Sequence, residues 1–336
     1  MATVDMHCHI VLEGLANALR ARSAPPRIER AADGSEQMIR HMGTAAIPGS
    51  SVESLLSNMD EHGIERAVLS NLFPDITNIA LADALPLCRA FNDAAAEACA
   101  RYPERLNAFA ALPFADIGAA VAEFERAMAL PGFVGAVLPC DGFLSAKRAA
   151  AFDPLLVSAD LRRAIMLVHY GLLPDDADAP KPDVSDNRYY RIGTLDMQSR
   201  ISSAMLTFCF TDFLTKYPNL TMMTHNLGGN IPFEVERMDH RALMDQPDEP
   251  LPSTVFRAAP LLLDCNSLGS RAIERAVEVY GPEKIVFGTD GTAFGMTWTQ
   301  RAIAEARISE SDRAAIRGAN AAAAIARVRG AVATAS

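Results

Sequence analysis

Four of the seven histidines and one aspartate come at the ends of short apolar runs. His7 and His9 end the first run, and His169, His225 and Asp290 end later ones. A single histidine in such a place is usually a hydrogen-bonded core residue, but five ionisable groups at the ends of four such runs need partners. Three imidazoles and a carboxylate suit zinc first, with manganese, iron or cobalt as alternatives. The set therefore predicts a divalent metal site with room for water.

The spacing of the first two histidines fits a β-strand. His7 and His9 lie two residues apart, so a strand points both imidazoles to the same face and turns Cys8 to the other. The remaining histidines, His41, His62 and His240, fall in loop or helix patterns. The metal site is therefore expected where strands end.

Eight apolar runs are expected to supply those strands. They lack polar alternation, which is typical of strands buried on both faces of a parallel sheet. The runs cover residues 4–10, 66–72, 106–113, 134–140, 164–170, 220–226, 260–266 and 284–290. Helical patterns separate them at 52–63, 80–102, 117–128, 152–163, 205–217, 270–281 and 311–328. The alternation predicts an α/β fold, a (β/α)8 TIM barrel, with a doubly wound sheet as the second choice.

Three local features qualify this pattern. Residues 11–51 and 171–199 are too long for plain turns and follow strands directly, so we expect two lids over the barrel mouth, or else mobile surface loops. Pro86 is expected to break or kink the second helix. The whole chain, residues 1–336, is predicted to be one barrel domain carrying these insertions.

The composition and net charge of the chain limit the kinds of molecule that it is expected to bind. The chain has 336 residues and a formal charge of −10, which argues against nucleic acid or an anionic membrane as the main partner. A small anionic substrate remains compatible, since it needs only one or two local cations. Six scattered cysteines without a CxxC motif indicate reduced thiols in a cytoplasm. No signal peptide and no apolar run of transmembrane length is visible.

Several segments carry a resemblance to a known family: VDMHCH, LVHYG, MTHNLGGNIPFEVER, FGTDG, MDEHGIERAVLS and YPERLNAFAALPF. Over nearly the whole chain they resemble the amidohydrolase superfamily, and within it the branch of aminocarboxymuconate-semialdehyde decarboxylase and related aromatic-acid decarboxylases. The resemblance implies that His7, His9, His169 and Asp290 bind one divalent metal ion, without an organic cofactor, and that His225 is the acid/base.

One check favours a single metal. Dinuclear relatives use a carboxylated lysine at the end of the fourth strand. Here that end reads LPCDG, and the four lysines of the chain lie elsewhere, at positions 147, 181, 216 and 284. We therefore expect one metal ion per chain.

The resemblance also points to two arginines that could hold a substrate carboxylate. Arg237 follows the histidine of MTHNLGG, where the family uses an arginine that sometimes reaches a neighbouring subunit's site and binds carboxylate through two parallel hydrogen bonds. This implies a homodimer; the alternative is a solvated helix arginine. Arg40, in the first lid, could replace the decarboxylases' loop arginine from a shifted position.

Two reactions suit the same ligands. The first is non-oxidative decarboxylation of an aromatic or muconate-type acid, with His225 guiding protonation of the carbon that bears the carboxylate. The second is hydrolysis of a C–N, C–O or C–C bond in an amide, lactone or β-diketone, with Asp290 moving the proton. The resemblance favours the first. The missing loop arginine and residues 291–294, where decarboxylases usually have tyrosine and Pro-Phe, favour the second. A barrel that only binds a ligand is a third reading.

Overall fold

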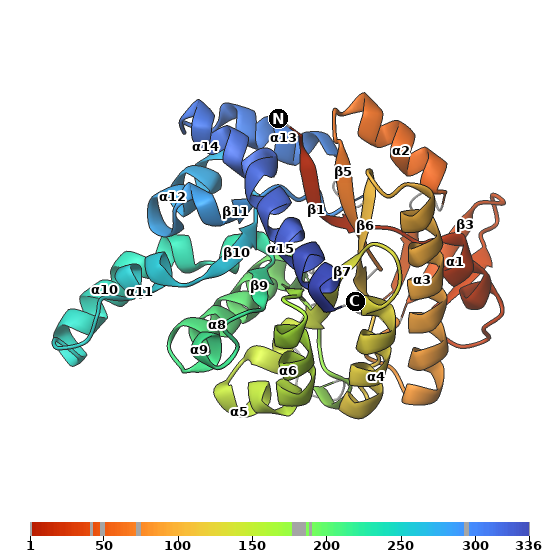
Figure 1. The fold of residues 1–336 in the computed structure, drawn as a ribbon, viewed down its shortest axis with the longest axis horizontal. Coiled ribbons are helices and arrows are strands. Elements are labelled where there is room, and N and C mark those ends of the chain that lie inside the picture. Colours follow the sequence, from red (N-terminus) through yellow and green to blue (C-terminus); the bar gives the residue numbers. More distant parts are fainter. Residues whose placement is uncertain are drawn as a thin grey trace.

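The computed structural model describes residues 2–40, 43–47, 51–71, 75–176, 186–187, 190–291 and 296–335. Eight parallel strands follow one another around a single sheet (Figure 1). They are β1 (Val4–His9), β5 (Arg66–Ser70), β6 (Leu106–Ala110), β7 (Phe133–Pro139), β8 (Ile165–His169), β9 (Thr221–Thr224), β10 (Leu261–Asp264) and β11 (Ile285–Val286). Each predicted run coincides with one of these strands, although β7 begins one residue before its run.

The sheet closes on itself between its first and last strands. The backbone N–H of Met6 donates to the carbonyl of Phe287 at 2.9 Å, and the N–H of Thr289 donates to the carbonyl of His7 at 3.3 Å. These bonds join β1 to the segment that follows β11, so an open, doubly wound sheet is excluded. The predicted (β/α)8 barrel is confirmed. Its strands are mostly apolar because side chains on one face fill the barrel and those on the other meet the helices, and their ionisable residues gather mainly at the strand ends.

Helices surround the strands. Those of eight residues or more outside the lids are α2 (Val52–Glu61), α3 (Leu81–Arg101), α4 (Ile117–Met128), α6 (Asp153–Leu161), α8 (Met197–Cys209), α10 (Ile231–Asp245), α12 (Ser270–Tyr280), α13 (Met296–Glu305) and α15 (Asn320–Ala335). Shorter ones are α5 (Ala146–Ala149), α9 (Phe213–Lys216), α11 (Pro252–Ala258) and α14 (Glu310–Ala314). Among the described residues, none of these helices combines the length and the apolar character that crossing a membrane requires.

Some helix predictions were wrong in detail. α3 runs through Pro86 without the expected break, because its buried face from Ala84 to Cys99 packs against the barrel. The predicted helix 205–217 is two helices, α8 and α9, and α8 starts earlier than predicted. The segment 311–328 is α14, a π-helical turn and α15.

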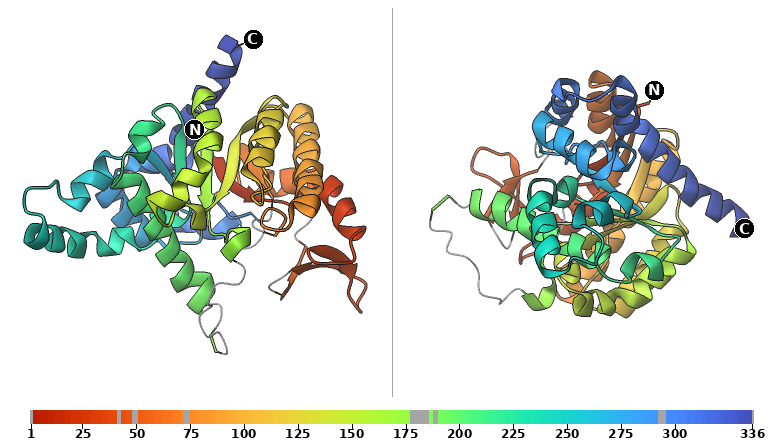
Figure 2. Two further views of the ribbon diagram at one scale, coloured as in Figure 1. Left: turned by 90° about the horizontal axis from the view of Figure 1, so that it is seen from below. Right: turned by 90° about the vertical axis from the view of Figure 1, so that its left-hand side faces the viewer.

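The first predicted lid has structure of its own. It contains α1 (Glu13–Arg20) and an antiparallel sheet of β2 (Arg27–Arg30), β3 (Glu36–Arg40) and β4 (Gly43–Ala46). Of the second, the described parts include a π-helical segment, Arg191–Asp196, that leads into α8. Figure 2 (left) shows the small sheet and the N-terminal end of α8 projecting from the same side of the barrel, with the end of α15 on the opposite side. Both insertions therefore lie toward the mouth.

Candidate metal centre

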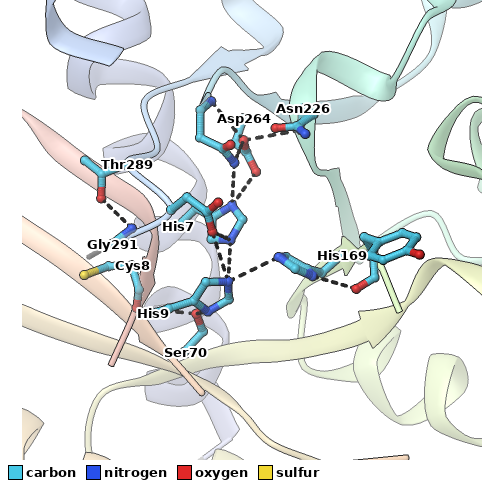
Figure 3. A network of polar contacts seen from close by, with 12 residues as sticks. His7, Cys8, His9, Ser70, His169, Asn226, Asp264, Thr289 and Gly291 are labelled. Carbon is cyan, nitrogen blue, oxygen red and sulfur yellow. Dashed lines mark hydrogen bonds and ion pairs between the residues drawn. The ribbon is translucent and has the colours of Figure 1, made fainter. Parts of the chain in front are cut away.

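Four side chains predicted from the sequence meet inside the barrel mouth, and Figure 3 shows the three histidines among them. The Nε2 atoms of His7 and His9 are 3.0 Å apart, and Nε2 of His9 is 3.2 Å from Nε2 of His169. One carboxylate oxygen of Asp290 lies 3.4 Å from Nε2 of His7 and 3.2 Å from Nε2 of His9. All four residues are buried, and their ligand atoms lie within 4.8 Å of one another.

These separations fit a divalent cation. Bonds of about 2.1 Å at tetrahedral or octahedral angles place neighbouring ligand atoms roughly 3.0–3.4 Å apart. Imidazole nitrogens with their lone pairs facing each other repel at such distances, unless a proton or a metal ion lies between them. Three nitrogen donors and one carboxylate suit zinc, manganese, iron or cobalt. The residues present therefore fit the predicted metal.

The other nitrogen of each imidazole is occupied, which fixes its tautomer. An Nδ1–H that is donated leaves Nε2 with a free lone pair for a metal. The acceptors are 2.9 Å away in each case: Asp264 Oδ2 for His7, the Ser70 hydroxyl for His9 and the backbone carbonyl of Tyr170 for His169. The three rings are thus oriented toward one point.

A left-handed turn brings the carboxylate to this point. Asp290 lies beyond the end of β11 with φ +59°, a conformation that is uncommon for a non-glycine residue. Thr289 holds the turn to the first strand: its hydroxyl and its N–H donate to the buried carboxylate of Asp5 at 2.6 and 3.1 Å. Gly288 allows the close approach, since a Cβ there would lie 2.9 Å from the Cβ of His7. The segment is strained and held at several points, as ligand-bearing turns often are.

The pKa shifts of the candidate ligands agree with a site that binds a cation. Burial alone would raise the pKa of Asp290, but the hydrogen bond from His9 and the charge of His7 lower it to about 2. Burial would lower the pKa of His7, but Asp264 beside its Nδ1 raises it to about 9. Without a metal ion, the His7 ring is therefore positively charged, and it lies between the carboxylates of Asp264 and Asp290. The centre is built for a cation.

His225 differs from its neighbours. It is buried 4.3 Å from the ring of His169 and 4.9 Å from the ring of His7, measured between centroids. Among the described residues, neither of its ring nitrogens has a hydrogen-bond partner. Burial lowers its pKa to about 4, so the ring is neutral near pH 7. A buried polar group without a partner is rare, and here it can exchange a proton with a molecule in the mouth.

The two predicted arginines are not part of this cluster. Arg40, on β3, pairs through Nε with the buried carboxylate of Asp75 at 2.7 Å. Arg237 is exposed on α10 and lines a surface groove with Leu206 of α8 and Phe210, which follows that helix, so within this chain it does not join the four candidate ligands. Residues 292–294, which follow Asp290 and bear on the choice of reaction, lie outside the described residues.

Several residues of the site were missed by the sequence analysis. Asp5 and Asp264 are acids within apolar runs, the same signal that revealed the histidines, and both were passed over. Ser70 gave no signal beyond its place at a strand end. The second lid is also joined to the barrel mouth by a contact that was not predicted. Arg200 of α8 donates to Asp141, which follows β7, at 2.6 Å and to Asp196, at the end of the π-helical segment, at 2.8 Å.

Comparison with known proteins agrees with this geometry. The amidohydrolase family profile Amidohydro_2 matches residues 4–326. A gamma-resorcylate decarboxylase of Polaromonas sp. strain JS666 is 28% identical over 279 residues, which cover 78% of this chain and 83% of the relative.

Two solved structures share the fold. A 2,6-dihydroxybenzoate decarboxylase in complex with 2,6-dihydroxybenzoate aligns with a TM-score of 0.72 and 23% identity, over 97% of this chain and 99% of its own. A dihydroxybenzoic acid decarboxylase from Polaromonas sp. JS666, with bound manganese and the inhibitor 2-nitroresorcinol, aligns with a TM-score of 0.70 and 22% identity over 97% of each chain. The barrel of this chain is thus also the barrel of decarboxylases.

Proposed function

Because the chain belongs to the amidohydrolase family, we propose that it is a metal-dependent enzyme that removes the carboxylate of an aromatic or muconate-type acid as CO2. The observation that supports this proposal best is His225: a buried imidazole without a partner among the described residues, beside four candidate metal ligands. The activity named for the relatives, decarboxylation of dihydroxylated benzoic acids, supports the same reaction class.

We further propose that His7, His9, His169 and Asp290 hold one divalent ion. Zinc is the first expectation from the ligand set, and manganese is the ion bound in a similar structure. When bound, the ion would polarise oxygen atoms of the substrate and stabilise negative charge that develops on them. No organic cofactor is needed for this chemistry.

The side chains of the protein would perform the proton transfer. His225 is neutral without a substrate, so it first takes up a proton from solvent when a substrate carboxylate beside it raises its pKa. It then delivers that proton to the ring carbon that bears the carboxylate, and a bond to hydrogen forms there. The bond between that carbon and the carboxylate then breaks, its electron pair returns to the ring, and CO2 leaves. In the hydrolase alternative, Asp290, whose carboxylate lies beside His7 and His9, would move the proton.

Substrate binding and assembly also remain proposals. Arg237 would hold a substrate carboxylate across the interface of a homodimer, and Arg40 would help from the first lid once released from Asp75. The chain would act as one catalytic domain in the cytoplasm. Each of these points comes from the sequence and awaits measurement.

The test combines elemental analysis with a screen for CO2 release. Purified protein should contain about one divalent metal ion per chain and release CO2 from 2,6-dihydroxybenzoate or another aromatic or muconate-type acid. One metal with hydrolysis of an amide, lactone or β-diketone, and no CO2, would make the hydrolase correct. Protein that binds no metal and gains no activity when metal is added would contradict the proposal.

A further inference from the structure

We propose that Asp264 is a positioning residue that fixes the imidazole of His7 for metal binding. This inference rests on the proposed metal centre and deepens it, since it assigns a role to a side chain that does not itself reach the metal position.

Asp264 is the last residue of β10 and is fully buried. Its Oδ2 accepts the Nδ1–H of His7 at 2.9 Å, as Figure 3 shows. A carboxylate in this place keeps the proton on Nδ1 and points the lone pair of Nε2 to the ion. It also makes the ring a stronger donor, because the partial negative charge passed to the imidazole raises the basicity of Nε2.

The carboxylate is itself prevented from rotating. Its second oxygen, Oδ1, accepts the backbone N–H of Asn266 at 3.1 Å and the side-chain amide of Asn266 at 2.6 Å. The backbone N–H of Asn226, from the loop after β9, approaches the same oxygen at 3.4 Å. Donors from two neighbouring loops therefore saturate Oδ1 and leave Oδ2 for His7.

Burying the carboxylate of Asp264 costs free energy, which points to a specific role for this residue. Burying a charge is unfavourable unless it is paired, and His7 is the one ion-pair partner of Asp264 within the described part of the chain. Arginine or lysine would be the usual partner of a structural buried acid. Here the carboxylate is instead placed behind a candidate metal ligand, where its charge balances that of the cation.

The other candidate ligands lack such support. His9 is oriented by the hydroxyl of Ser70 and His169 by the backbone carbonyl of Tyr170, both neutral acceptors. The effect of Asp264 should therefore pass through His7 alone. That asymmetry makes the inference testable with one conservative substitution.

The experiment compares Asp264→Asn with Glu123→Gln. Both change a buried acid to its amide, but Glu123 lies on α4, where it pairs with Arg126 and contacts Asn92, away from the metal centre. Metal-free wild type and variants are titrated with Mn²⁺ in competition with a chelator dye, and Co²⁺-loaded samples are compared by visible absorption. Thermal unfolding of the metal-free proteins is recorded in parallel.

We expect Asp264→Asn to raise the Kd for Mn²⁺ by roughly 10–100-fold, as other supports of metal-binding histidines do. Its Co²⁺ bands should change in position or intensity, because the His7 ring is free to turn. Glu123→Gln should lower the unfolding temperature but keep the wild-type affinity and spectrum. A purely structural role for Asp264 would lower its unfolding temperature alone.

Wild-type affinity and spectrum in Asp264→Asn would overturn the inference while leaving the metal centre intact. Failure of the wild type to bind metal would overturn the proposed function instead. If Asp264→Asn does not fold, Asn266→Ala replaces it. This substitution removes a donor to Oδ1 of Asp264, and the same side-chain amide lies 2.8 Å from Nδ1 of His7, so it should weaken Mn²⁺ binding to a smaller extent. Unchanged binding there would also count against the inference.

Discussion

A single methyl group at position 288 should damage the metal centre more than it damages the fold. Gly288 precedes the turn that carries Asp290, and a Cβ built there lies 2.9 Å from the Cβ of His7 and 3.3 Å from the Cβ of Asp264, whereas ordinary contacts are 3.4–4 Å. In Gly288→Ala the last strand must move away from the first by a few tenths of an ångström or more. The atoms that must move belong to a candidate ligand and to the residue that supports it.

The size of the effect follows from this geometry. Overpacking of a well-packed interior costs about 1–3 kcal/mol, so the free energy of unfolding should fall by that amount. The same displacement separates His7 from Asp290, which approach each other across the closure of the barrel. We expect the Kd for Mn²⁺ to rise at least tenfold, on the order of 1.4 kcal/mol of lost binding.

The assay needs a glycine that has room for a methyl group. A Cβ built on Gly330, in α15, has no described atom within 4 Å outside its chain neighbours and its own helix backbone, so Gly330→Ala should leave metal binding unchanged and alter the free energy of unfolding by less than about 1 kcal/mol. Urea unfolding of the metal-free proteins and Mn²⁺ titration are measured for both variants. If Gly288→Ala kept wild-type stability and affinity, the close approach described here would be wrong.

Three further predictions concern the roles of single side chains. His225→Ala should keep its metal content but lose at least about 100-fold in kcat, as loss of a general acid or base does; an unchanged kcat would remove His225 from the mechanism. His169→Ala should bind metal weakly, and full occupancy by elemental analysis would contradict its assignment as a ligand. Arg237→Ala should raise the KM for a carboxylate substrate about tenfold or more, while Arg241→Ala on the same helix, paired with Asp245, should not; an unaltered KM in Arg237→Ala would end that proposal.

The sequence predicted the barrel because its signal is repeated. Strands such as β7 and β8 are buried along their whole length, so nearly all of their side chains are apolar, and this pattern is visible in one dimension. The sheet of the first lid was not predicted. Strands such as RIER and EQMIR are only partly buried and polar, and nothing in them separates a strand from a loop.

The candidate site could be predicted only in part, for a related reason. The histidines stood out because imidazoles are rare in apolar runs. Asp264 carries the same signal, but an acid that ends a strand can equally bind a nearby backbone amide, so its contact with His7 appears only in three dimensions. The Asp-Gly pair at 290–291 signals a turn, but the sequence does not show that the turn is held by the distant carboxylate of Asp5 through Thr289.

The closure of the barrel has a consequence for how the protein is made. The hydrogen bond from Thr289 to Asp5 joins residues 284 positions apart, and the candidate ligands lie on both sides of that joint. Contacts of such long range form late, since the chain between them must first be ordered. On a ribosome, the first strand would leave the exit tunnel long before its partner exists. The two N-terminal imidazoles would therefore be synthesised early, but they could not form a complete metal site until nearly the entire polypeptide has been synthesised.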